Sequence, residues 1–465
     1  MSKLINKYIT IFAAALSLAL WSCDDNSPST DLLSSVPADA MVVAKTDFLN
    51  IITEAGCLPT NGRYLLTPAI ESLLESSDTS TQTLVTLLAD LAPEVDLTSV
   101  VWYLYTENSQ PVIIAGAKDA EALMARLAHS STASVKISDY NVYTFDGACV
   151  IVRDRHLWIA RSADHVIEIN EIAAKKSFST NTAKVKSLNS SGDIVAVVSG
   201  VKTSIPGLEI PEESFATISA RCLRSGFNLH VSLSAPDGKS VEIGSGMEYI
   251  EPSFVSLMPR QTAACIAVGN LDWHMIYPAV AGAFDGGGGV ILPMLRPYIE
   301  AIDGTVAVAV APAAGMQSLG NFDLSTWEVF FSASMPQEKL DQFTTLISAL
   351  STMSDIPCRA NDNGTYTLQL PDGIAITIGN INGSLVIANY DLSVAGAQKF
   401  STSFDNKVLA MDIDIPYNGE LARTLGLPWG ISVDAGVGSS SFDAMIKLNG
   451  IKTTPLKALI EYLAK

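Results

Sequence analysis

The chain has 465 residues, with 29 basic and 48 acidic side chains and a formal charge of −19. Apolar residues make up 48% of the chain and charged residues only 17%, which excludes an intrinsically disordered protein. The acidic excess repels DNA, RNA and anionic lipid headgroups, so we expect no nucleic-acid partner. A chain of this length predicts about two to four domains.

Residues 1–22 have the layout of a secretory signal peptide. Lys3 and Lys7 form a basic start, and a mostly apolar run follows from Ile9 to Trp21. The run is too short to span a membrane comfortably. It ends in LWSC, residues 20–23, which resembles a lipobox: an aliphatic residue, a free position, a small residue and a cysteine. We predict that residues 1–22 are removed and that the thiol of Cys23 carries a diacylglyceryl group.

The predicted anchor is followed by a polar tether, residues 23–31, with the sequence CDDNSPSTD. Two or three acyl chains such as palmitate hold a protein stably, because each buried methylene adds about 0.8 kcal/mol. Acidic residues directly after a lipidated cysteine resemble the surface-export signal of Bacteroides-group lipoproteins. In other bacteria an aspartate there resembles an inner-membrane retention signal. We expect an outer-membrane lipoprotein that faces the cell surface rather than the periplasm.

The remaining cysteines are widely spaced and form no C-x-x-C motif or Cys/His cluster. We expect most of them to be small buried apolar residues rather than disulfides or metal ligands. The sequence predicts no cofactor and no metal site. These five cysteines are Cys57, Cys149, Cys222, Cys265 and Cys358.

The chain contains a series of paired segments whose order is preserved. Strand-like and helix-like segments recur with similar element types about 205 to 225 residues apart, which is the pattern of a tandem duplication. We therefore predict a first repeat over 32–250, with a helical insertion near 61–94, and a second repeat over 251–465. The pairs are 36–49 with 258–273, 95–106 with 302–312, 111–128 with 327–347, 143–161 with 366–389, 192–200 with 406–416, and 225–238 with 439–450.

The periodicity of the apolar residues predicts an α+β fold. A helix is expected over 163–176, with Ser162 as its N-cap, because apolar residues recur there at helical spacing. Alternating segments joined by polar turns predict antiparallel strands. We expect each repeat to be a mainly antiparallel sheet with helices packed on one face.

The segment SVPADAMVVAKTDFLNIITEAGC, residues 35–57, resembles the start of uncharacterised Bacteroides-group lipoproteins of domain-of-unknown-function family 4836. The shared features are the lipobox, a V-P-x-D-A opening followed by a strand and a helix, and a similar length. The resemblance implies a cell-envelope location. It implies no activity, since none is assigned to the family.

Motifs typical of catalysis are absent from the sequence. It contains no H-E-x-x-H, no G-x-S-x-G and no complete phosphate-binding loop. Asp412 and Asp414 alternate with Leu409, Met411, Ile413 and Ile415, so both carboxylates project from one face of a strand. We expect this to be a solvated face of the sheet, because alternation alone places polar residues there. The alternative is a cation or carboxylate-pair site at Asp412 and Asp414.

Taken together, these features predict a lipid-anchored cell-envelope protein with a binding or assembly role. Its partners are expected to be the membrane, through Cys23, and an unidentified envelope or extracellular ligand. The sequence favours a protein that is not an enzyme. Two alternatives stay open: an envelope hydrolase whose catalytic carboxylates or Ser/His residues are scattered along the chain, and a structural subunit of a surface appendage.

Overall fold

The computed structural model describes most of the chain from residue 30 to residue 464. The predicted signal peptide, Cys23 and most of the tether lie outside the described residues. The other gaps within 30–464 are 61–62, 76, 78, 107–108, 202–209, 244–246, 271–272, 275–276, 278–290, 314–323 and 397–403.

The described residues form two compact units. The first unit contains residues from 30–241 together with 451–464, and the second contains residues from 242–450. The predicted second repeat, 251–465, therefore includes a C-terminal helix, α13 (Pro455–Leu463), that packs in the first unit against α3 (Phe48–Glu54) and α4 (Pro68–Glu75).

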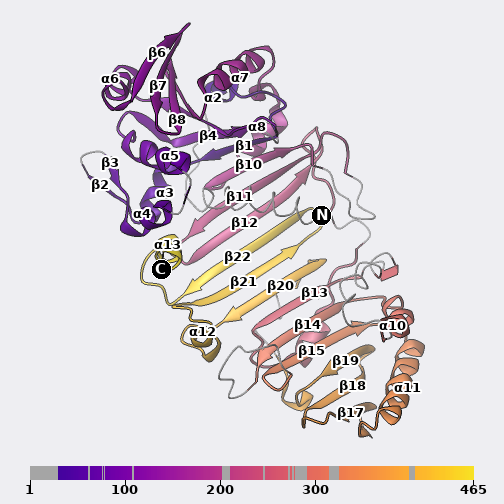
Figure 1. The fold of residues 1–465 in the computed structure, drawn as a ribbon. Coiled ribbons are helices and arrows are strands. Elements are labelled where there is room, and N and C mark those ends of the chain that lie inside the picture. Colours follow the sequence, from indigo (N-terminus) through magenta and orange to yellow (C-terminus); the bar gives the residue numbers. More distant parts are fainter. Residues whose placement is uncertain are drawn as a thin grey trace. The chain divides into compact units, whose positions relative to one another are not determined.

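The first unit begins with short helices around a strand and continues into an antiparallel sheet (Figure 1). Two helices, α4 and α5, lie in the segment 61–94. Besides α3, α4 and α13, the elements of the first unit are α2 (Thr30–Ser34), β1 (Val42–Thr46), β2 (Leu58–Thr60), β3 (Arg63–Leu65), α5 (Thr79–Asp90), β4 (Val95–Leu104), β5 (Val112–Ala117), α6 (Ala120–Ser130), β6 (Ala133–Ile137), β7 (Tyr140–Phe145), β8 (Ala148–Arg153), β9 (His156–Ala160), α7 (Ala163–Lys175), η1 (Phe178–Thr180), α8 (Thr182–Leu188), β10 (Ile194–Ser199), β11 (Phe215–Leu223) and β12 (Gly226–Ser234).

The second unit has fewer described helices. Its elements are η2 (Pro252–Leu257), β13 (Ala264–Val268), α10 (Ile291–Ile299), β14 (Val306–Pro312), β15 (Trp327–Ser334), α11 (Gln337–Met353), β16 (Cys358–Ala360), β17 (Thr365–Gln369), β18 (Ala375–Ile381), β19 (Ser384–Ala388), η3 (Leu392–Val394), β20 (Leu409–Ile415), α12 (Glu420–Thr424), β21 (Gly430–Val437) and β22 (Ser441–Asn449).

Strand pairing within each unit is antiparallel and follows the same order. In the first unit the strands lie in the order β6-β7-β8-β9-β5-β4-β1-β10-β11-β12. In the second unit the order is β16-β17-β18-β19-β15-β14-β13-β20-β21-β22. The two orders are identical when the strands are matched in chain order. The expected α+β class with antiparallel sheets is therefore confirmed.

Several local predictions are also confirmed. Helix α7 covers Ala163–Lys175, and the Ser162 hydroxyl accepts a hydrogen bond from the His165 backbone N–H at 3.4 Å. All five described cysteines are free, and Cys358 is the only one of these that is partly exposed. Burial raises the pKa of Cys149 to about 11, which keeps that thiol protonated and unreactive at neutral pH.

In the second unit the α-helices α10 and α11 lie on one face of the sheet, as expected, and the opposite face is covered by the 3-10 helix η2. In the second unit, Ala307 and Phe330 belong to an apolar cluster with η2. Their neighbours Val306 and Phe331 belong to another cluster with α10 and α11. Because successive residues of a strand point to opposite faces, these clusters cover opposite faces of the sheet. In the first unit, β1 is likewise buried at every position, so both of its faces are covered.

The predicted solvated face of β20 is wrong. Asp412 is only 7% exposed and Ala410 only 1%, whereas Leu409 on the other face is 39% exposed. The buried face consists largely of small residues, including Ala267, Ala307 and Ala309, which let Phe254 and Phe404 pack closely. The alternating sequence correctly predicted two faces of β20. The face with the large aliphatic side chains was expected to be buried, but the face with Ala410 and Asp412 is the buried one.

The opposite face of the second unit carries an exposed aliphatic patch on adjacent strands. Ile266 is 49% exposed, Val308 is 42% exposed and Leu409 is 39% exposed. Val308 lies directly opposite Ile266 in the ladder, and Leu409 lies opposite Val268, two residues further along β13. We call Ile266, Val308 and Leu409 the aliphatic patch.

The reversed burial predicts unequal costs for two truncations. Phe404 is fully buried and makes an edge-to-face contact with Phe254, with ring centroids 5.2 Å apart. We expect Phe404→Ala to lower the free energy of unfolding by about 3 to 5 kcal/mol, because it leaves a cavity. Leu409→Ala on the patch should cost about 1 kcal/mol or less. Urea denaturation of both variants measures this difference, and equal losses would contradict the assigned burial.

Candidate functional site

The predicted acidic pair, Asp412 and Asp414, lies on β20, which is hydrogen-bonded to β13 on one side and to β21 on the other. Asp412 is opposite Cys265 of β13 and Asp434 of β21, and Asp414 accepts a hydrogen bond from the Ser432 hydroxyl at 3.0 Å. Burial, with a smaller contribution from the Asp412 charge, raises the pKa of Cys265 to about 12. Within the described parts of the chain, no group of three or more His, Cys, Asp or Glu side chains could hold a metal ion. Asp412 and Asp414 therefore do not form a metal site with such residues.

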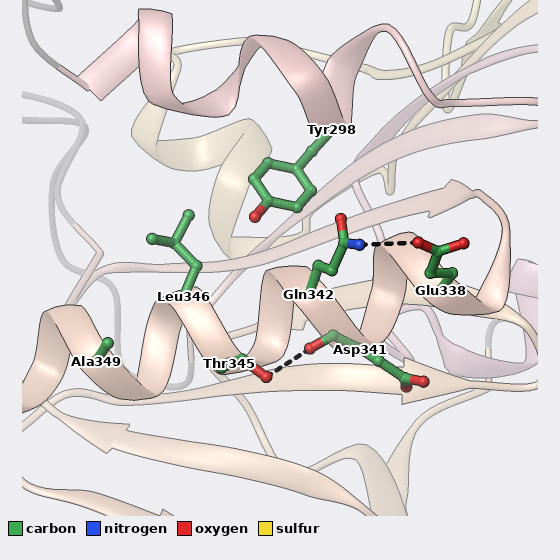
Figure 2. Close-up of a pocket in the computed structure, with 7 residues that line it drawn as sticks. All are labelled: Tyr298, Glu338, Asp341, Gln342, Thr345, Leu346 and Ala349. Carbon is green, nitrogen blue, oxygen red and sulfur yellow. Dashed lines mark hydrogen bonds between the residues drawn. The ribbon is translucent and has the colours of Figure 1, made fainter.

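A shallow groove of about 570 Å³ lies between α10 and α11 (Figure 2). Its polar groups already bond within α11: the Gln342 amide donates to Glu338 at 3.0 Å, and the Thr345 hydroxyl donates to the Asp341 carbonyl at 2.8 Å. Tyr298 reaches across from α10 and packs edge-to-face on Phe343. Helix packing accounts for the groove, and Gln342, Glu338 and Thr345 are already hydrogen-bonded within α11.

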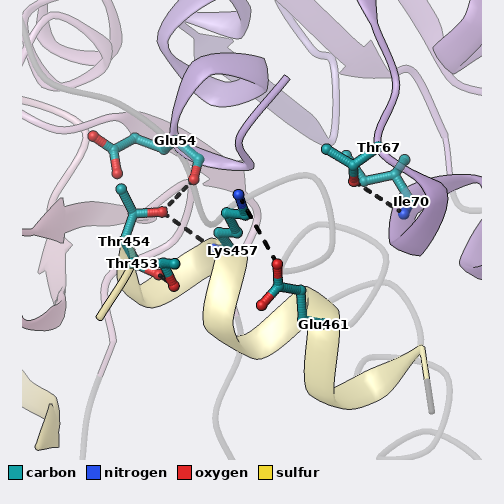
Figure 3. A network of polar contacts seen from close by, with 7 residues as sticks. All are labelled: Glu54, Thr67, Ile70, Thr453, Thr454, Lys457 and Glu461. Carbon is teal, nitrogen blue, oxygen red and sulfur yellow. Dashed lines mark hydrogen bonds and ion pairs between the residues drawn. The ribbon is translucent and has the colours of Figure 1, made fainter. Parts of the chain in front are cut away.

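A polar network ties the C-terminal helix into the first unit (Figure 3). The Thr454 hydroxyl caps α13 by accepting from the Lys457 backbone N–H at 3.3 Å, and it donates to the Glu54 carbonyl at the end of α3. Lys457 lies 4.0 Å from Glu461 one helical turn further on. This network has a structural role, since its groups fasten one helix to another.

The best candidate site is a pocket of about 690 Å³ at one end of the sheet in the second unit. Its lining comes from five places: the approach to β13, the end of β14, the start of β15, the turn between β17 and β18, and the segment after β19. Because neighbouring strands run antiparallel, the end of one strand and the start of the next lie side by side at the same end of the sheet. The volume is within the range of small-molecule sites, about 300 to 1,000 Å³.

Glu328 is the chemically unusual residue of this pocket. Its side chain is half-buried, and burial raises the pKa of its carboxyl above the ordinary value. No hydrogen bond or ion pair with another described residue engages this carboxylate. A carboxyl group that is partly desolvated and lacks a partner, in a cleft, is a typical feature of a binding site.

The surrounding polar groups of the pocket are held by internal hydrogen bonds. The Asn389 amide donates to the carbonyls of Leu324 and Trp327 at 2.9 and 2.7 Å, and its oxygen accepts from the Val329 N–H at 2.6 Å. The Tyr390 hydroxyl donates to the Leu257 carbonyl. Burial, together with the charge of Glu328, raises the pKa of Tyr390. These side chains therefore form a fixed wall around Glu328.

None of these residues is predicted as a site residue from the sequence. Trp327 and Glu328 are adjacent in the apolar run WEVFFSAS, and a single carboxylate inside such a run was the one available signal. Arg260 and Tyr390 are far from them in the chain, so nothing local linked the group.

The described helices include none that is long and apolar enough to cross a membrane. No protein-family model and no curated protein matches the chain. Among solved structures, three crystal forms of TP0453 align with 44 to 49% of this chain and 81 to 88% of theirs, at 10 to 12% identity. Their TM-scores are 0.26 to 0.27, so the likeness supports no conclusion about fold or function.

The environment of Glu328 predicts a pH dependence of stability. Its pKa is raised above the ordinary 4.5, so the folded chain keeps this proton to higher pH than the unfolded chain. The contribution of Glu328 to the free energy of unfolding therefore falls as the pH rises from its pKa in the unfolded chain to its higher pKa in the folded chain. We expect Glu328→Gln to gain stability relative to the wild type between acidic and neutral pH, as measured by urea denaturation. An exposed control, Glu420→Gln, should follow the wild type; if Glu328→Gln follows it too, the carboxyl is not desolvated.

Proposed function

We propose that this chain is a lipid-anchored protein of the cell envelope that binds a small ligand in the pocket beside Glu328. The anchor is Cys23, and the location is the outer membrane with the body at the cell surface. The observation that carries the binding role is the half-buried carboxylate of Glu328, which has no hydrogen bond or ion pair with another described residue and lies in a pocket where Asn389 and Tyr390 are held by hydrogen bonds. A non-enzymatic role agrees with the sequence, which contains no motif typical of catalysis.

We also propose that the two units are divergent tandem repeats. The identical strand order supports this proposal, as does the position of the paired sequence segments. Residues 36–49 contain β1 and residues 258–273 contain β13, the first strand of each sheet. Segments 192–200 and 406–416 likewise contain β10 and β20. The resemblance of residues 35–57 to family 4836 supports the envelope location.

The anchor is tested in cells with Cys23→Ala. The wild-type protein should partition into the membrane fraction, and the variant should leave it because no thiol remains to take the lipid. Protease added to intact cells should digest the wild-type body. Protection until lysis would contradict the surface location, and a Cys23→Ala protein that stays in the membrane would contradict the lipid anchor.

The binding role is tested on the soluble chain 24–465 with a library of small fragments by ligand-observed NMR. Ala375→Trp places an indole in the pocket at the start of β18 and should abolish the binding of most hits. Ala349→Trp, in the groove between α10 and α11, is the matched control and should bind as the wild type does. The proposal fails if no fragment binds or if only Ala349→Trp reduces binding.

A further inference from the structure

The charges of the pocket point to the chemistry of its ligand. Three carboxylates line it, Glu328, Asp372 and Asp391, against one guanidinium, that of Arg260. The two aspartates are exposed and each accepts a backbone N–H two residues on, from Ile374 at 3.2 Å and from Ser393 at 2.9 Å. Only Glu328 among the three carboxylates is half-buried without such a bond. The pocket therefore has an excess of negative charge, and Glu328 has the least compensated one.

Two potential hydrogen-bond donors of the same wall are already engaged, whereas Arg260 and Gln261 in the lining are exposed to solvent. Both N–H groups of the Asn389 amide already donate to backbone carbonyls, and the Tyr390 hydroxyl is engaged by Leu257. Arg260 lies in the segment that leads into β13, and its side chain is exposed to solvent. A ligand that donates hydrogen bonds and carries positive charge would meet the need of Glu328, whereas an anion would add repulsion.

The aromatic residues of the lining favour an organic body on the ligand. Trp327 and Tyr390 line the same pocket and are both partly exposed. Aromatic side chains provide apolar contact area, and their ring faces also attract cations. A bare metal ion would need several oxygen ligands close together, and the described residues form no such group.

We propose that the pocket binds a small organic cation whose protonated amine lies at the Glu328 carboxylate and whose body lies against Trp327 and Tyr390. This inference rests on the proposed binding function and adds the ligand class to it. The ammonium group supplies the hydrogen-bond donors and the positive charge that the carboxylate lacks. Ionic attraction between the two groups is screened by salt, so binding weakens as ionic strength rises.

Three probes of nearly equal shape test the proposal: benzylamine, benzyl alcohol and benzoate, which are cationic, neutral and anionic at neutral pH. Dissociation constants are measured by NMR titration with chain 24–465. Benzylamine should bind about tenfold more tightly than benzyl alcohol, a difference of about 1.4 kcal/mol, and benzoate should bind most weakly. Glu328→Gln should remove the advantage of benzylamine over benzyl alcohol, whereas the exposed control Glu420→Gln should keep it.

The outcomes separate the two proposals. If all three probes bind equally and Ala375→Trp blocks them, the pocket binds ligands but the assigned charge preference is wrong. If Glu328→Gln retains the preference for benzylamine, the carboxylate is not its cause and the inference is overturned. If Ala375→Trp blocks none of the probes or library fragments that bind, the binding function itself fails. Thermal unfolding of Glu328→Gln confirms that the variant is folded before it is titrated.

Discussion

The first strand of each unit is hydrogen-bonded along both edges to strands from distant parts of the chain. β1 lies between β4 and β10, and β13 lies between β14 and β20. A buried strand needs partners on both edges, because its N–H and C=O groups point alternately to the two sides. Bringing these distant strands together costs chain entropy, which is compensated only when the strands have paired and packed. The remaining strands add to a sheet whose centre is set by these non-local pairs.

The proposed binding pocket is a consequence of that pairing. Strands that run antiparallel bring the end of β14, the start of β15 and the end of β19 to one edge of the sheet. The pocket residues come from segments beside these strand ends, so main-chain hydrogen bonds fix their spacing. Glu328 is the second residue of β15, and no described residue of the pocket wall forms a hydrogen bond or ion pair with its carboxylate. The sheet can hold this partly desolvated carboxylate in place because the other interactions of the fold offset its free-energy cost.

The two faces of the second unit differ in how they are packed. Alanines on β13, β14 and β20 leave room for aromatic side chains from η2 and from Phe404. On the opposite face, the helices α10 and α11 pack over Val306 and Phe331, while the aliphatic patch beyond them is exposed. The smaller side chains are therefore the more buried ones, since close approach of a covering element requires small residues beneath it. Asp412 shares the buried face because its position in the alternation places it there.

The sequence by itself determined the α+β class, the N-cap of α7 and the burial of most of the described free cysteines, because each depends on local periodicity or composition. It is also the sole basis for the lipid anchor at Cys23, which stays a prediction. Only the tertiary structure decided which face of β20 is buried, since an alternating pattern is the same whichever side packs. It alone brought Arg260, Glu328 and Tyr390 into one pocket. Those residues are distant in the chain, and the contacts that join them arise from strand pairing rather than from any local motif.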